Sequence, residues 1–342
     1  MTVTKSHDEI IQLCCSSIQR RYSIVDQPNA LRRLKREFDF VRERGFISRL
    51  QEALNLAESL TESHTVFRLI GSGCTSYVNF LLGLSEVNPV QFRLPWQRFW
   101  ATSDGEAPTF LFVADLANEE PTRRIRGLTI HRMSVLETIP HRLRAFEIPE
   151  FDKATFDRIS AGDTAGVFQF ENDAVRKLAV QLQPTTVREL ATVTAVALRE
   201  CSDPELAAGF MRNHSRNHVG DDTNDGLNSA PRLFQEELIA VLRRRAGLNP
   251  FQAYEFIRES KKNGGLNVNH PLYEKALHGA TANESNATKA QQVVRTVERD
   301  SQSADCLAHH VANAITSYRS AYLKTHYSGR FAKLLEEQTT QT

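Results

Sequence analysis

A short apolar segment, a glycine-serine turn and a second apolar segment follow one another between residues 65 and 83, and few folds accommodate that order. The three parts are Thr65–Ile70, Gly71-Ser72-Gly73 and Ser76–Gly83. They predict a strand, a loop and a helix. Backbone N–H groups where such a helix begins favour an anion, typically a phosphate. No lysine follows the turn, so the segment is not a Walker A motif. A tight turn with a helix cap and a phosphate site are the two interpretations that fit it.

The segments around this unit predict an α+β protein with a larger helical second half. Amphipathic helices are expected at 8–20 and 30–43 and again from Ile47 to Leu60, and a buried strand at Thr109–Leu116. Residues 123–146 are ambiguous, part strand and part helix. Further helices are predicted at 172–182, 187–199, 232–245, 250–263, 289–301 and 308–335. Two polar stretches, 214–230 and 278–288, have the composition of loops.

Charge and cysteine usage narrow the class of protein. The 342 residues carry 42 Lys+Arg and 41 Asp+Glu, a net charge of +1, so any DNA contact must come from local basic patches. The five cysteines lack zinc-binding spacing and are expected to be free thiols in a reducing compartment. The N-terminus lacks a signal-peptide core, and no apolar run of 18 residues occurs. We therefore expect a cytoplasmic protein without a membrane partner.

The order of motifs around the turn resembles the palm of bacterial C-family DNA polymerases. The residues that carry the likeness are Arg32–Phe46, the turn itself, Tyr77–Pro89 and Arg98-Phe99. The resemblance implies that Gly71 and Ser72 face the triphosphate of an incoming nucleotide and that Ser76 is the family's second serine. The arginine that precedes the family's Gly-Ser pair is Ile70 here.

The likeness resumes in the second half. It runs through Gly162–Glu171, Ala197-Leu198-Arg199, Leu233–Glu236 and His309–Tyr327. It implies a nucleotidyltransferase-like palm with a small mixed sheet at 30–160, a mainly helical fingers-like domain at 161–342, and a helical extension at 1–29. The family's phosphoesterase-like, thumb, helix-hairpin-helix and OB regions are expected to be missing. The nucleotide-binding candidates in this half are Arg199, Arg258, Lys262 and His309, although solvated helix charges explain the cations equally.

The metal-binding acids of the family do not recur. The family holds two Mg²⁺ ions with aspartates on adjacent strands, whereas the matching positions here carry Thr109, Leu111 and Val113. A second strand is matched loosely by Arg124–Leu128, which is cationic. We therefore predict no catalytic residue, no metal ligand and no firmly bound cofactor. A relocated Mg²⁺ site stays open, with these acids nearby: Asp104, Glu106, Asp115, Glu119 and Glu120.

Three interpretations follow from this pattern. The favoured one is a DNA polymerase III alpha-like protein, replication-related and catalytically impaired, that still binds a nucleoside triphosphate or DNA. The second is a non-catalytic scaffold or decoy that binds replication proteins. The third is a nucleotidyltransferase with a relocated metal site.

Overall fold

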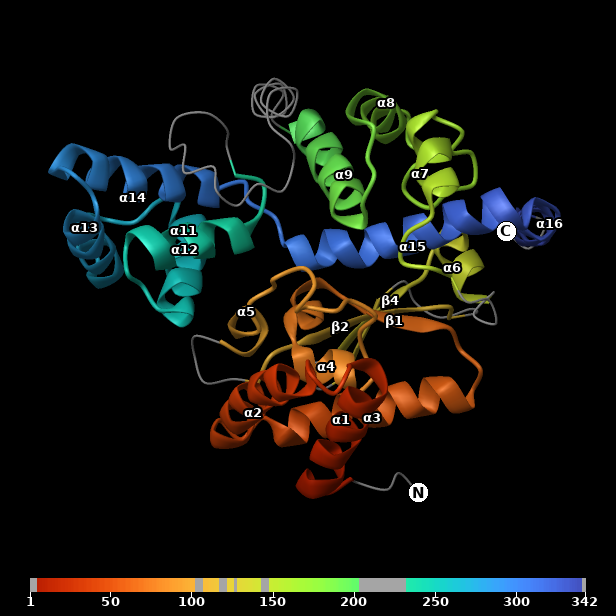
Figure 1. Ribbon diagram of the computed structural model, residues 1–342, viewed down its shortest axis with the longest axis horizontal. Helices are drawn as coiled ribbons and strands as arrows, with labels where there is room; N and C mark the ends of the chain where they lie inside the picture. Colours follow the sequence, from red (N-terminus) through yellow and green to blue (C-terminus); the bar gives the residue numbers. More distant parts are fainter. Residues whose placement is uncertain are drawn as a thin grey trace. The chain divides into compact units, whose positions relative to one another are not determined.

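The computed structural model describes residues 5–101, 107–116, 122–125, 128–142, 148–202 and 232–339 (Figure 1). The chain divides into two compact units. Unit 1 comprises Met1–Glu150, Gly166–Phe168 and Val311–Thr342, and unit 2 comprises Phe151–Ala165 and Gln169–His310. Unit 1 contains a mixed sheet, and unit 2 is built from helices, so the predicted α+β class is confirmed. The domain bounds drawn from the family's functional regions stay a prediction.

Unit 1 begins with three helices that the sequence pattern predicted. They are α1 (His7–Arg21), α2 (Gln27–Glu43) and α3 (Ile47–Glu62). Ser6 starts α1 with a capping box, in which its hydroxyl accepts from the Glu9 N–H and the Glu9 carboxylate accepts from the Ser6 N–H. The apolar stripe of α2 is buried along its length: Ala30, Leu34, Phe38 and Val41.

The strand, loop and helix expected at 65–83 are present as β1 (Phe67–Ile70), the 3₁₀ helix η1 (Gly71–Thr75) and α4 (Tyr77–Leu81). The unit continues with α5 (Gln97–Trp100), β2 (Phe110–Ala114), β3 (Thr122–Ile125), β4 (Leu128–Arg132) and α6 (Val135–Arg142). Within the described part of the ambiguous segment, 123–125 and 128–132 are strand and 135–142 is helix. The sheet has the order β1-β2-β4-β3, with β2 and β4 parallel and the other two pairs antiparallel.

The two faces of this sheet differ in chemistry. Residues that pair in register point to the same side, so one face carries Leu69, Phe110, Phe112, Leu128 and Ile130, all of them buried. The ring centre of Phe110 lies 4.9 Å from that of Phe99 and 6.1 Å from that of Trp100. This face forms the aromatic core of unit 1, and Figure 1 shows helices α1 to α4 on one side of the sheet.

The opposite face is mixed in character. It carries Arg68 and Ile70 from β1, Leu111 and Val113 from β2, Thr129 and His131 from β4, and Thr122 and Arg124 from β3. Side chains of α6 and of α15 (Leu307–His326) hydrogen-bond to Arg68 on this side. We call this surface the Arg68 face.

Unit 2 contains α7 (Lys153–Ser160), α8 (Asp173–Leu182), α9 (Val187–Ser202), α11 (Gln235–Arg245), α12 (Pro250–Asn263), α13 (Pro271–Asn283) and α14 (Ala287–Ser301). Helices α11 to α14 enclose a continuous apolar core that includes Leu242, Phe256 and Val294. Helix α15 starts in this unit and continues into unit 1.

The prediction of a polar loop at 278–288 is wrong, because α13 extends to Asn283 and α14 begins at Ala287. Composition misled the prediction, since this helix buries only small side chains, Ala276 and Ala280, beside Tyr273. Gly279 permits that close packing. A Cβ atom there would lie 2.0 Å from the carbonyl oxygen of Ala246, so only glycine fits.

The prediction of one helix over 308–335 is also wrong. The segment forms two helices, α15 and α16 (Ser328–Thr339), separated at Tyr327. The break lets Phe331 and Leu323 pack with Ile139 of α6 in one buried cluster. Helix α7 was not predicted, and the polar stretch 214–230 lies outside the described residues.

Candidate nucleotide site and the sheet face beneath it

The glycine-serine loop has the backbone that its sequence suggests. Gly71 has a φ of +72°, in the left-handed region that favours glycine. A Cβ atom on Gly71 would lie 3.6 Å from Cδ2 of Leu111, so the loop lies directly over β2. Gly71 and Ser72 are half-buried. Their backbone can therefore still be approached by a ligand.

Cys74 of the loop is a buried residue of the core. Its buried Sγ donates to the carbonyl oxygen of Leu69 at 3.2 Å. Burial raises the pKa of the Cys74 thiol to about 11, so the reactive thiolate is scarce at neutral pH.

The N-terminus of α4 is occupied by a carboxylate of the protein itself, Glu37 of α2. Glu37 is fully buried and accepts hydrogen bonds from the Tyr77 N–H at 2.9 Å, from Trp100 Nε1 at 2.8 Å and from the Ser76 hydroxyl. The Ser76 oxygen also accepts from the Asn79 N–H at 3.1 Å. Both the Ser76 hydroxyl and the anion-binding end of this helix are therefore engaged inside unit 1.

Burial raises the pKa of the Glu37 carboxyl, and the hydrogen bonds from Ser76, Trp100 and Tyr77, together with nearby Arg33, act against that rise. Sequence reasoning missed this residue, although a signal was present. Glu37 lies within the apolar stripe of α2, beside Leu34 and Phe38, where a charged side chain needs a buried partner.

The positions that the resemblance assigns to metal-binding acids lie on the Arg68 face beneath the loop. Leu111 and Val113 occupy them, and their register partners on β4 are Thr129 and His131. None of the described strand residues on this face has a carboxylate. Mg²⁺ requires several hard oxygen ligands in near-octahedral geometry, so the residues present here do not fit the ion.

A buried ion pair lies on the Arg68 face beside Val113, the register partner of Arg68. Arg68 Nε donates to Glu137 Oε1 at 2.6 Å, and Arg68 Nη2 donates to Asn313 Oδ1 at 2.7 Å. The side chains of Arg68 and Glu137 are only 4% and 7% exposed. The acid of α6 that reaches this face is thus paired with an arginine and is not available to a metal ion. The sequence analysis did not single out either residue.

Within the described ranges, no group of three or more His, Cys, Asp or Glu side chains could hold a metal ion. Asp115 follows β2, and its N–H donates to the Val66 carbonyl oxygen at 2.8 Å. The other acids named for a relocated site lie outside the described residues: Asp104, Glu106, Glu119 and Glu120.

The remaining nucleotide-binding candidates belong to unit 2. On α12, Arg258 Nη2 pairs with Glu259 Oε1 at 2.9 Å, and Lys262 is exposed one turn further along. His309 is half-buried, with its ring centre 5.8 Å from that of His310. Residue 199 is part of α9, but the side chain of Arg199 lies outside the described residues. A role in nucleotide binding stays a prediction for all four residues.

Two family models match consecutive parts of the chain. The bacterial DNA polymerase III alpha NTPase domain matches residues 8–110, and the bacterial DNA polymerase III alpha subunit finger domain matches residues 128–284. The chain belongs to the bacterial DNA polymerase III alpha family. This confirms the resemblance that the motifs around the loop suggested. The first of these models contains the whole strand–loop–helix unit with Glu37.

Curated relatives agree with this assignment. The DNA polymerase III subunit alpha of Halalkalibacterium halodurans is 26% identical over 60% of this chain and 19% of its own length. That of Mycoplasma pneumoniae is 30% identical over 54% of this chain and 22% of its own length. The error-prone DNA polymerase of Rhodopirellula baltica is 27% identical over 56% of this chain and 17% of its own length. The chain thus spans about a fifth of the length of these polymerase relatives.

Among the described helices, none has both the length and the apolar character needed to span a membrane.

Proposed function

We propose that this chain is a catalytically impaired relative of the polymerase III alpha subunit that still binds a nucleoside triphosphate or DNA. In this proposal unit 1 corresponds to a nucleotidyltransferase-like palm and the helices of unit 2 to fingers. The observation that carries the proposal is the proximity of Gly71 to Leu111, since a Cβ atom added to Gly71 would lie 3.6 Å from Leu111 Cδ2. The loop that should face a triphosphate lies over an aliphatic side chain at a position where phosphoryl transfer needs a metal-binding acid.

Retention of a phosphate contact is supported by the loop's backbone. Gly71 keeps its left-handed conformation, and Ser72 remains half-buried rather than sealed in the core. The Ser76 hydroxyl is already hydrogen-bonded to Glu37 and Asn79. The phosphate contact would therefore depend on Gly71 and Ser72 and would not include Ser76. Arg199, Arg258, Lys262 and His309 are separate nucleotide-binding candidates within unit 2.

Thermal unfolding with added nucleotide tests this function. A ligand at about ten times its Kd stabilises by about 1.4 kcal/mol, a rise of roughly 2–4 °C in Tm for a domain of this size. The Ser72→Arg variant should lose the rise because the new side chain fills the approach to the loop. Ser16→Arg, on an exposed position of α1, is the matched control and should keep it.

Primer extension with Mg²⁺ is the complementary measurement. We expect no extension above background, because Leu111 and Val113 offer no oxygen ligands to Mg²⁺. Extension that Ser72→Arg abolishes would contradict the proposal and favour a relocated metal site. Absence of any thermal shift with millimolar nucleotide or with primed DNA would favour the alternative of a scaffold that binds replication proteins. The engagement of Ser76 and of the α4 N-terminus inside unit 1 is the observation that keeps that alternative open.

A further inference from the structure

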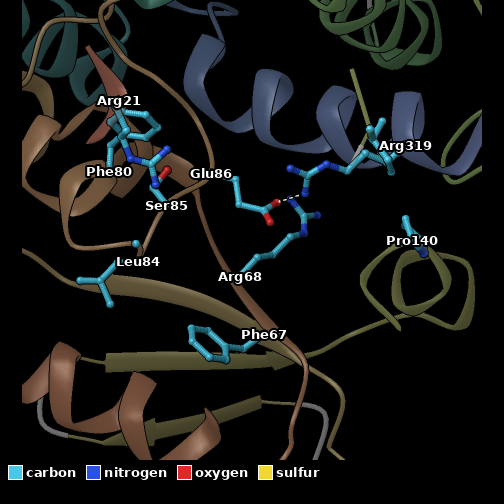
Figure 2. Close-up of a pocket in the computed structure, with 11 residues that line it drawn as sticks. Arg21, Phe67, Arg68, Phe80, Leu84, Ser85, Glu86, Pro140 and Arg319 are labelled. Atoms are coloured by element: carbon cyan, nitrogen blue, oxygen red, sulfur yellow. Dashed lines mark ion pairs between the residues drawn. The ribbon is translucent and has the colours of Figure 1, made fainter. Parts of the chain in front are cut away.

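Unit 1 has a polar cavity that the residues of the Gly71 loop do not line. It has a volume of about 440 Å³, within the range of small-molecule sites. Its lining comes from α1, from β1, from the segment that follows α4, from α6 and from α15. Figure 2 shows the guanidinium groups of Arg68 and Arg319 extending toward the carboxylate of Glu86. Gly71, Ser72 and Ser76 do not line this cavity.

The cavity has an excess of positive charge. Among the described residues of the lining, Arg21, Arg68 and Arg319 are cationic and Glu86 is the one acid. Arg319 Nη1 pairs with Glu86 Oε2 at 2.7 Å, and Arg68 pairs with Glu137. Arg21 is left as the surplus cation, its guanidinium lying 4.7 Å from the centre of the Phe80 ring. Such a charge balance favours an anionic occupant.

Arg68 supplies a second and independent indication of a ligand. Its side chain is 4% exposed, and its Nε and Nη2 are hydrogen-bonded as described above. Its Nη1 is buried and has no hydrogen-bond partner. A buried guanidinium N–H without an acceptor is costly, so an acceptor supplied by a ligand would stabilise the protein.

The rest of the lining indicates what else the ligand carries. Phe80, Leu84 and Ile148 give the cavity an apolar wall, in which the ring of Phe80 lies beside Arg21. A bare oxyanion would leave this wall in contact with water, whereas a molecule with an aromatic or aliphatic body would cover it.

We propose that this cavity binds a small phosphorylated molecule with an apolar body. Its phosphate accepts hydrogen bonds from Arg68 Nη1 and pairs with Arg21, and its body lies against Phe80. Guanidinium groups suit phosphate oxygens because their N–H donors form a planar fork. The site goes beyond the proposed triphosphate contact and shares no residue with it.

Calorimetric titration of the full chain with deoxyadenosine monophosphate tests the site, with deoxyadenosine as the ligand that lacks the phosphate. We expect binding of the monophosphate at least tenfold tighter than that of the nucleoside. The Arg21→Gln variant should weaken binding roughly ten- to a hundredfold, because it removes a charged hydrogen-bond partner. Arg20→Gln, the neighbouring exposed arginine outside the cavity, is the matched control and should bind unchanged.

The Glu86→Gln variant tests whether the charged residues of the cavity bind a ligand or only form a structural ion pair. The substitution removes the acid that lines the described part of the cavity and frees Arg319, so phosphate affinity should rise, a result that a misfolded variant cannot give. The Ser72→Arg variant should bind the monophosphate as the unaltered chain does. The proposal is overturned if the unaltered chain binds no monophosphate at millimolar concentration. It is also overturned if Arg21→Gln and Glu86→Gln leave affinity unchanged, or if Ser72→Arg abolishes binding.

Discussion

The Gly-Ser loop and strand β2 lie against each other in unit 1, and they have changed to different degrees relative to the family pattern. The loop keeps its glycine, its left-handed backbone and its serine. Strand β2 keeps its place beneath the loop but carries Leu111 and Val113 on the face where acids are expected. Under the proposed function, the difference teaches that the frame of a catalytic site can persist without the groups that perform chemistry, because the frame is also needed for packing.

The largest expected effect concerns the buried ion pair on the Arg68 face. Arg68→Met leaves Glu137 buried and unpaired, and we expect unit 1 to lose about 3–5 kcal/mol of unfolding free energy. Urea unfolding followed by tryptophan fluorescence measures this, since the two tryptophans, Trp96 and Trp100, both belong to unit 1. The double variant Arg68→Met with Glu137→Met should regain part of the loss.

Lys35→Met is the control for that experiment. It breaks an exposed pair with Asp39 on α2 and should cost well under about 1 kcal/mol. A loss for Arg68→Met as small as that of the control would mean that the ion pair does not hold the Arg68 face together.

The next largest effect is expected from removing Glu37, which accepts the hydrogen bonds from the residues that follow the loop. Glu37→Ala leaves the Ser76 hydroxyl, the Tyr77 N–H and the Trp100 N–H without their acceptor, so a loss of about 3 kcal/mol is expected. Glu37→Gln keeps one acceptor oxygen and should lose less. The same urea titration measures both variants. Equal losses would show that the carboxylate charge, rather than hydrogen bonding, supports the loop.

The Glu37 carboxyl also makes a prediction about pH. Its pKa is raised in the folded state above the ordinary value of 4.5, so the folded protein binds the proton more tightly than the unfolded chain. Stability relative to Glu37→Gln should therefore fall as pH rises from about 4.5 through the folded pKa. A relative stability that rises over this window would contradict the assignment.

A smaller effect is expected from restoring an acid to β2. Leu111→Asp places a lone carboxylate at a half-buried position and should cost about 1–2 kcal/mol. Mg²⁺ at millimolar concentration should not recover this loss, because one carboxylate is too few ligands. Leu111→Asn is the control of similar shape. If Mg²⁺ restores the stability of Leu111→Asp but not that of Leu111→Asn, further metal ligands must lie close to residue 111. That result would contradict the contrast drawn between the loop and strand β2.

The smallest effect tests the loop's backbone. Gly71→Ala puts a Cβ atom on a residue with φ of +72° and should cost about 1 kcal/mol through strain. Gly329→Ala in α16 meets nothing within 4 Å and should be neutral or slightly stabilising. Thermal unfolding compares the two, and a neutral Gly71→Ala would mean that the left-handed loop is not required.

The sequence predicted those features that depend on neighbouring residues. Turn chemistry and apolar periodicity led to β1, the loop and α4, and family motifs led to the family assignment. The partners of Glu37 could not be predicted in the same way, because they lie 39 to 63 residues further along the chain. Helix α13 was missed because its packing depends on the absence of a side chain at Gly279, which polar composition conceals.

The position of Glu37 has a consequence for how this chain can be shortened. A fragment that begins after Glu43 would keep the whole of β1, η1 and α4 yet would lack the acceptor for their buried donors. Truncations meant to isolate the Gly-Ser motif must therefore retain α2, and a peptide or graft that carries residues 65–83 alone should not adopt the same loop.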